Sequence, residues 1–136
     1  MTVQMQSATM APAAGFLRKV LLADAATGII SAVGQTMLTG EFVRLTGMPS
    51  GLLFMSGLAL YPIAAFMAWT ALRTPLMPAA VWIIILGNVG WALASLALLL
   101  VPTLVPTPAA AVLVAAQAAA VAMFAIFEWV GLKRSK

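Results

Sequence analysis

The chain contains no cysteine and no histidine, and it has few charged residues. Without cysteine it can form no disulfide bond, thiolate nucleophile or iron–sulfur site, and without histidine it has no imidazole base or imidazole metal ligand. Charged residues make up only 7% of its 136 residues, whereas a soluble domain carries roughly 25%. A water-soluble fold is therefore excluded, because these side chains cannot supply its polar surface.

Hydrophobic residues make up 64% of the chain, which is typical of a polytopic membrane protein. A disordered chain is excluded as well, since disorder requires low hydrophobicity and high charge. A helix needs about 20 mostly apolar residues to cross the hydrocarbon core of a bilayer. Four stretches meet this requirement: residues 20–38, 52–72, 79–101 and 109–130. The sequence thus predicts an all-α membrane protein with four transmembrane helices.

Glycine and proline separate the predicted helices. Proline cannot donate a backbone N–H, and it pushes the preceding residue out of helical geometry. These residues are Gly40, Gly47, Pro49 and Gly51 in the first link, Pro75 and Pro78 in the second, and Pro102, Pro106 and Pro108 in the third. Short links predict an antiparallel up-down-up-down bundle over residues 18–132. We expect a flexible tail over residues 1–17 and a basic tail over residues 133–136.

Basic residues predict the orientation in the membrane. With a cytoplasmic N-terminus, that side holds Arg18, Lys19, Arg73, Lys133, Arg134 and Lys136, and the other side holds only Arg44. The positive-inside rule therefore places both termini in the cytoplasm, in a bacterial inner membrane. Indole rings favour the membrane interface, and three tryptophans fall at the predicted cytoplasmic helix ends, namely Trp69, Trp82 and Trp129.

The net charge of +4 has a simple explanation in this arrangement. Basic residues at the cytoplasmic face are attracted to anionic lipid, so the lipid bilayer is the first expected partner. A homo-oligomer or a partner membrane protein is the second. Nucleic acid is not an expected partner.

Polar residues within the predicted spans form the candidate site. In the first span Asp24, Ser31 and Gln35 recur at spacings that place them on one helical face. Such a stripe faces protein or water, because lipid cannot form hydrogen bonds with it. The other candidates are Tyr61, Asn88, Gln117 and Glu128. These residues either form hydrogen bonds between helices or line a site for binding or transport.

The two acidic candidates are open to different interpretations. An ionised acid inside a membrane is costly and marks a pathway or a partner. However, Asp24 lies about one helical turn from Arg18, so a structural ion pair would also explain it. Glu128 precedes Trp129 and lies within reach of Lys133, so we expect it at the membrane interface.

Small residues at helical spacing predict close helix packing. Without a hydrophobic driving force between helices in lipid, small residues let backbones approach and gain van der Waals contact. The residues with this predicted role are Gly28, Gly90, Ala115, Ala118 and Ala122. They would pack within the bundle or against a second copy of the chain.

No catalytic or cofactor motif is recognisable. A nucleophile–base pair cannot be assembled without histidine or a buried lysine, and the glycines follow no phosphate-loop pattern. Met1, Met5 and Met10 are better explained as apolar residues than as copper ligands. An acid dyad of Asp24 and Glu128 would require the first and fourth spans to be adjacent. We therefore expect no catalysis, no cofactor and no metal.

Two functional hypotheses remain open. The first is a small inner-membrane protein without catalysis, acting as an accessory, assembly or interaction subunit or as a packed homo-oligomer. The alternative is a small proton- or cation-coupled transporter or channel that acts as a dimer with Asp24 as its titrating group. The surroundings of Asp24 distinguish them, because a transport acid must face a cavity rather than a basic side chain.

Overall fold

The computed structural model describes residues 2–134 of the chain, with side chains described from Gly15 to Arg134. Regular structure in this described part is entirely helical, which confirms the predicted all-α fold. It consists of α1 (Thr2–Met37), α2 (Thr39–Thr46), α3 (Ser50–Leu72), α4 (Pro78–Leu98) and α5 (Pro108–Arg134). Residues 1, 135 and 136, which belong to the predicted tails, lie outside the described residues.

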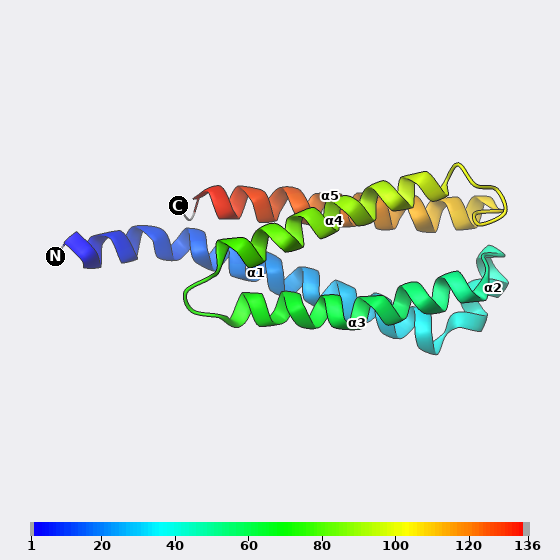
Figure 1. The fold of residues 1–136 in the computed structure, drawn as a ribbon, viewed down its shortest axis with the longest axis horizontal. Helices are drawn as coiled ribbons and strands as arrows, with labels where there is room; N and C mark the ends of the chain where they lie inside the picture. The colour runs from blue at the N-terminus through cyan, green and yellow to red at the C-terminus, as the bar shows by residue number, and fades with distance from the viewer. Residues whose placement is uncertain (1, 135–136) are drawn as a thin grey trace.

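The four long helices correspond to the four predicted apolar stretches, although α1 ends at Met37 and α4 at Leu98, before the predicted ends at residues 38 and 101. They run antiparallel in chain order (Figure 1). Helices α3, α4 and α5 are long and apolar enough to cross a membrane. Helix α1 contains the first predicted stretch but is not one of these three candidate spans. Helix α1 packs against both α3 and α5.

Helix α1 begins well before the predicted boundary at residue 17. Leu17 is fully buried, and Arg18 Nη1 donates to the carbonyl oxygens of Ala71 at 2.6 Å and Arg73 at 2.9 Å. These contacts attach α1 to the end of α3, so packing includes part of the segment predicted as a tail. At the other terminus, Lys133 and Arg134 belong to α5 rather than to a separate tail.

The first link contains the short helix α2, which the sequence analysis does not predict. Its eight residues are TGEFVRLT, and a polar segment between two glycines is typical of a turn. Gly47 ends the helix with φ 73°, and its N–H donates to the Val43 oxygen at 2.7 Å. This left-handed conformation favours glycine, because a Cβ atom would clash with the backbone there.

The long helices form two hairpins, α1 with α3 and α4 with α5, and these hairpins are joined where α1 packs against α5. Helices α3 and α4 follow each other in the chain but make little contact, and they diverge from their short link (Figure 1). The packing order is therefore α3–α1–α5–α4, and the bundle is not closed between α3 and α4.

Two separate apolar clusters hold the ends of the bundle. The first, near the α3–α4 link, includes Leu17, Leu21, Met67, Val81 and Leu132. The second, near α2, consists of Met48, Leu53, Ala110 and Val114 with partly buried neighbours. The middle of the bundle belongs to neither cluster.

The predicted packing residues divide into two groups. Gly28 packs against α3, since a Cβ atom at Gly28 would lie 3.3 Å from the Ala64 Cβ. Ala118 is buried and Ala122 half-buried, whereas Ala115 and Gly90 are exposed. A Cβ atom at Gly90 would meet no atom within 4 Å. Gly90 therefore has no packing role within this chain, because its side of α4 faces away from the other helices.

Among the glycines, the least room for a side chain is found at Gly57 and Gly131, which are not among the predicted packing residues. At Gly57 of α3, a Cβ atom would lie 2.8 Å from the Gln35 Cβ of α1. At Gly131 of α5, it would lie 3.0 Å from the Leu17 Cβ of α1. Each glycine is single rather than part of a small-residue repeat, so periodicity alone does not distinguish it.

Helix α1 begins and α5 ends at the same end of the bundle as the α3–α4 link (Figure 1). Basic and aromatic side chains are in contact there. Arg73 lies 4.8 Å from the ring centre of Trp69, and Lys133 lies 4.6 Å from that of Trp129. Arg44 is on α2 at the opposite end. The two ends of the bundle therefore differ in charge.

Candidate ligand-binding cavity

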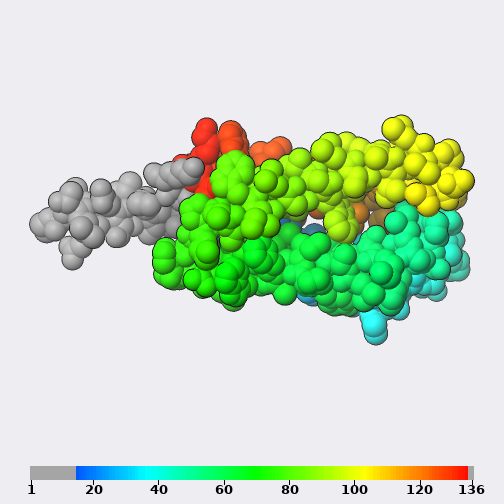
Figure 2. Space-filling model, in the orientation of Figure 1, coloured from blue at the N-terminus to red at the C-terminus, as the bar shows by residue number. Residues whose placement is uncertain are grey.

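A cavity of about 730 Å³ lies in the middle of the bundle, between the two hairpins. All four long helices line it, and Phe42 of α2 contributes at one end. Its lining is mostly apolar and includes Leu60, Ile63, Phe66, Met67, Ile83, Ile84, Trp91, Leu113, Val121 and Phe124. Figure 2 shows the molecule hollowed between α3 and α4, the pair of helices with little mutual contact.

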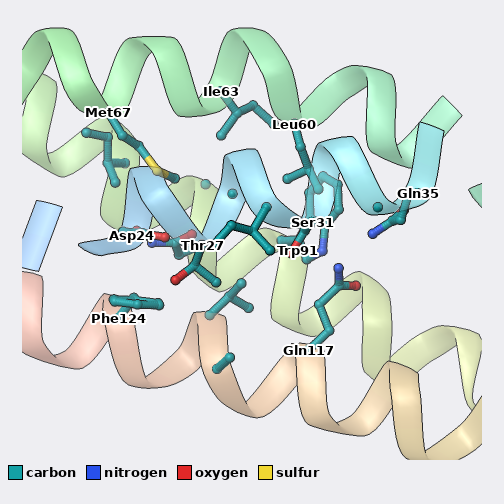
Figure 3. Close-up of a pocket in the computed structure, with 18 of the residues that line it drawn as sticks. Asp24, Thr27, Ser31, Gln35, Leu60, Ile63, Met67, Trp91, Gln117 and Phe124 are labelled. Atoms are coloured by element: carbon teal, nitrogen blue, oxygen red, sulfur yellow. Dashed lines mark hydrogen bonds between the residues drawn. The ribbon is translucent and has the colours of Figure 1, made fainter. Parts of the chain in front are cut away.

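The polar stripe predicted on α1 faces this cavity. Asp24, Ser31 and Gln35 line it from α1, and Gln117 lines it from α5 (Figure 3). Asp24 and Phe124 lie toward one end of the cavity, and Gln35 and Gln117 lie toward the other. Within the described part of the chain the side chains of Ser31, Gln35 and Gln117 make no hydrogen bond. These groups are therefore free to contact a ligand.

Asn88 connects two buried acids from different helices. Its Nδ2 atom donates to Asp24 Oδ2 at 2.7 Å and to Glu128 Oε1 at 2.9 Å. Asp24 is 4% exposed and Glu128 is 0% exposed. The three side chains link α1, α4 and α5, and both Asp24 and Asn88 also line the cavity. Glu128 lies behind them, and its Oε2 atom is buried without a hydrogen-bond partner.

Neither buried acid has a basic partner in the described part of the chain. The salt bridge observed there joins Arg44 to Glu41 on α2, where both side chains are exposed. Arg18, expected near Asp24, instead donates to carbonyl oxygens at the end of α3. The ion pair that would make Asp24 a structural residue is therefore absent from the described residues.

Glu128 does not lie on the surface of the bundle, where a contact with Lys133 would place it. Its side chain is fully buried in the bundle, while Trp129 is exposed and is contacted by Lys133. On a helix, the side chains of adjacent residues point about 100° apart, so one can be buried while the next is exposed. Glu128 belongs instead to the face of α5 that meets Asn88.

Tyr61 has a separate role from the other candidates. Its hydroxyl lies 2.9 Å from Thr36 Oγ1, which joins α3 to α1. It is not one of the residues that line the cavity. Of the predicted polar residues, the structure thus brings Asp24, Asn88 and Glu128 into contact and places Ser31, Gln35 and Gln117 around the same space.

Sequence reasoning missed the aromatic part of the site. Phe66, Trp91 and Phe124 line the cavity from three different helices. Helical spacing places Trp91 on the face of Asn88 and Phe124 on the face of Gln117, whereas no such signal marks Phe66. Their common location depends on how the hairpins pack.

The cavity combines a large apolar volume, free amide and hydroxyl groups, and acids without a basic partner. The described residues contain no group of three or more histidine, cysteine, aspartate or glutamate side chains that could hold a metal ion. The arrangement is suited to binding a molecule that is mostly apolar and carries a polar group. No protein-family model, curated protein or solved structure matches the chain, so its function has to be inferred from this geometry.

Proposed function

We propose that the chain is an integral membrane protein that spans a bacterial inner membrane with its four long helices. The apolar character of α3, α4 and α5 supports this, as does the concentration of basic side chains at one end of the bundle. Helix α1 carries a polar stripe, which protein neighbours on α3 and α5 accommodate. The basic end faces the cytoplasm and contacts anionic lipid.

Within the membrane, the protein acts without catalysis by binding a small, mostly apolar molecule in the cavity between its hairpins. The observation that supports this best is the cavity volume of about 730 Å³, which lies within the roughly 300–1,000 Å³ of small-molecule sites. The side between α3 and α4 gives a path for molecules dissolved in the bilayer, because these helices make little contact.

Filling the cavity tests this function. Gly87 lines the cavity, and Gly87 and Gly90 are both exposed glycines of α4 at which an added Cβ meets no atom within 4 Å. We expect Gly87→Leu to weaken binding of n-octanol to the purified protein about tenfold, since lost volume removes apolar contact. Gly90→Leu is the matched control, because Gly90 does not line the cavity.

Isothermal titration calorimetry in a neutral detergent measures both affinities. Saturable binding of n-octanol to the unaltered chain and to Gly90→Leu, with weaker binding to Gly87→Leu, supports the proposal. Absence of saturable binding to the unaltered chain would overturn it.

A second candidate function is proton- or cation-coupled transport by a dimer, with Asp24 as the titrating group. The observation that favours it is that Asp24 lines the cavity and has no basic partner in the described part of the chain. The exposed small residues Gly90 and Ala115 offer surfaces for a second copy or for a partner membrane protein.

Flux measurements in reconstituted vesicles distinguish transport from binding alone. Under this second function, Asp24→Asn abolishes proton- or cation-driven uptake while the melting temperature changes little. Glu41→Gln is the control, because Glu41 is exposed on α2 and pairs with Arg44. Vesicles with the unaltered chain that show no uptake over a broad range of substrates would argue against transport.

A further inference from the structure

We infer that the molecule bound in the cavity is a small amphipathic cation, whose positively charged amine contacts Asp24 and whose apolar body fills the cavity. This inference rests on the proposed function, because it names the class of molecule that the cavity binds. It is carried by the placement of Asp24, the Asn88 amide and several aromatic rings around a space without basic side chains, with the buried acid Glu128 behind Asn88.

The charge of the site favours a cation. Asp24 lines the cavity, and Glu128 lies directly behind it through the shared Asn88 amide. No residue that lines the cavity in the described part of the chain is basic. Buried ionised groups without a partner are costly, and a ligand with a positive charge offsets that cost. An anionic ligand would instead meet the acidic side chain of Asp24 with no basic residue in the cavity lining beside it.

An unused hydrogen-bond acceptor adds a second, independent indication. Glu128 is fully buried, yet its Oε2 atom has no donor in the described residues. An unsatisfied buried acceptor costs free energy unless a donor or a cation is supplied. A cation bound beside Asp24 lies on the cavity side of the Asn88 amide that both acids share.

The aromatic lining is compatible with the same ligand. Phe66, Trp91 and Phe124 line the cavity, and Phe124 lies toward the same end as Asp24 (Figure 3). The faces of aromatic rings attract alkylammonium groups electrostatically. The rest of the lining is mostly aliphatic and provides contact for a hydrocarbon chain.

Three probes with the same hydrocarbon chain test the inference by calorimetry: n-octyltrimethylammonium, n-octanol and n-octyl sulfate. They differ in head group, which is positive, neutral or negative. We expect the unaltered protein to bind n-octyltrimethylammonium about tenfold more tightly than n-octanol. We expect n-octyl sulfate to bind more weakly than n-octanol, because of the acidic side chain of Asp24.

Two conservative variants test the role of the acids. Asp24→Asn and Glu128→Gln each replace a carboxyl group with an amide and keep a carbonyl oxygen that accepts from Asn88. We expect each to lower the affinity for n-octyltrimethylammonium about tenfold and to change that for n-octanol much less, because n-octanol carries no charge. Glu41→Gln is the matched control, since it removes the one acid outside the site. If Asp24→Asn does not purify as a folded protein, Glu128→Gln carries the same test.

The outcomes separate this inference from the proposed function. Equal affinity of the unaltered protein for n-octyltrimethylammonium and n-octanol would overturn the cation preference and leave cavity binding intact. Acid variants that bind n-octyltrimethylammonium as tightly as the unaltered protein would likewise overturn the cation preference and leave cavity binding intact. Absence of binding by all three probes would overturn the proposed function and this inference together.

Discussion

At the scale of single residues, Asn88 has the most consequential position in the molecule. One amide nitrogen donates to acids from two other helices, at 2.7 Å and 2.9 Å. Those acids would otherwise be buried without a donor in the described part of the chain. The amide therefore determines how α4 is positioned against α1 and α5 beside the cavity.

Removing this amide should destabilise the fold. Asn88→Ala leaves both Asp24 and Glu128 without their hydrogen bond, so we expect a loss of about 2–4 kcal/mol. Ser95→Ala is the control on the same helix, because the buried Ser95 hydroxyl donates only to the Trp91 oxygen of α4. Its expected cost is about 0.5 kcal/mol or less. Thermal unfolding in detergent measures both, and equal melting temperatures would show that Asn88 has no such role.

At the scale of helices, the distance between α1 and α3 depends on Gly57. A Cβ atom at Gly57 would lie 2.8 Å from the Gln35 Cβ of α1, so this contact leaves no room for a side chain. Close backbone approach lets Tyr61, one turn further along α3, reach Thr36 on α1. Gly57, together with Gly28, thus sets the close packing of the hairpin on one side of the cavity.

A methyl group at Gly57 should separate these helices. We expect Gly57→Ala to destabilise the protein by about 1–3 kcal/mol, because overpacking outweighs the better helix propensity of alanine. Gly90→Ala should instead be neutral or stabilise by up to about 1 kcal/mol, since its site is open. Melting temperatures of the two variants give the comparison, and a Gly57→Ala protein as stable as Gly90→Ala would contradict the packing argument.

At the end of the bundle away from the termini, the Thr107 side chain holds the α4–α5 link against α2. Its hydroxyl donates to the Thr46 oxygen at 2.6 Å and accepts from the Ala110 N–H at 3.1 Å. It therefore caps α5 and attaches α2 to the α4–α5 link. We expect Thr107→Val to cost about 1–2 kcal/mol, whereas Thr103→Val in the same exposed link costs little. Faster amide hydrogen exchange in α2 of Thr107→Val would identify the lost attachment, and unchanged exchange would argue against it.

At the scale of the whole molecule, the unequal distribution of charge between the two ends has a direct test. The chain has no cysteine, so a single cysteine can report its own location. We expect Arg44→Cys to react in intact cells with a maleimide that cannot cross the membrane. Arg73→Cys should react only after permeabilisation, because the basic end faces the cytoplasm. The reverse labelling pattern would show that the proposed orientation is inverted.

The sequence by itself determined the properties that depend on composition and on one helix at a time. These include the helical class, the four apolar stretches, the asymmetry of the basic residues and the shared face of Asp24, Ser31 and Gln35. Each follows from local rules, namely the length of apolar runs, turn residues and the helical repeat. Such rules need no knowledge of neighbouring helices.

Only the tertiary structure decided which helix faces meet. The pairing of α1 with α3 and of α4 with α5 leaves a cavity where a closed bundle would have a core. It buries Glu128 beside Asp24 through Asn88, although these residues lie 40 and 64 positions from Asn88. Apolar and small residues occur on most faces of these helices, so periodicity cannot choose the packed face. That choice depends on close contacts such as Gly57 with Gln35 and Gly131 with Leu17, which form only between helices already in register.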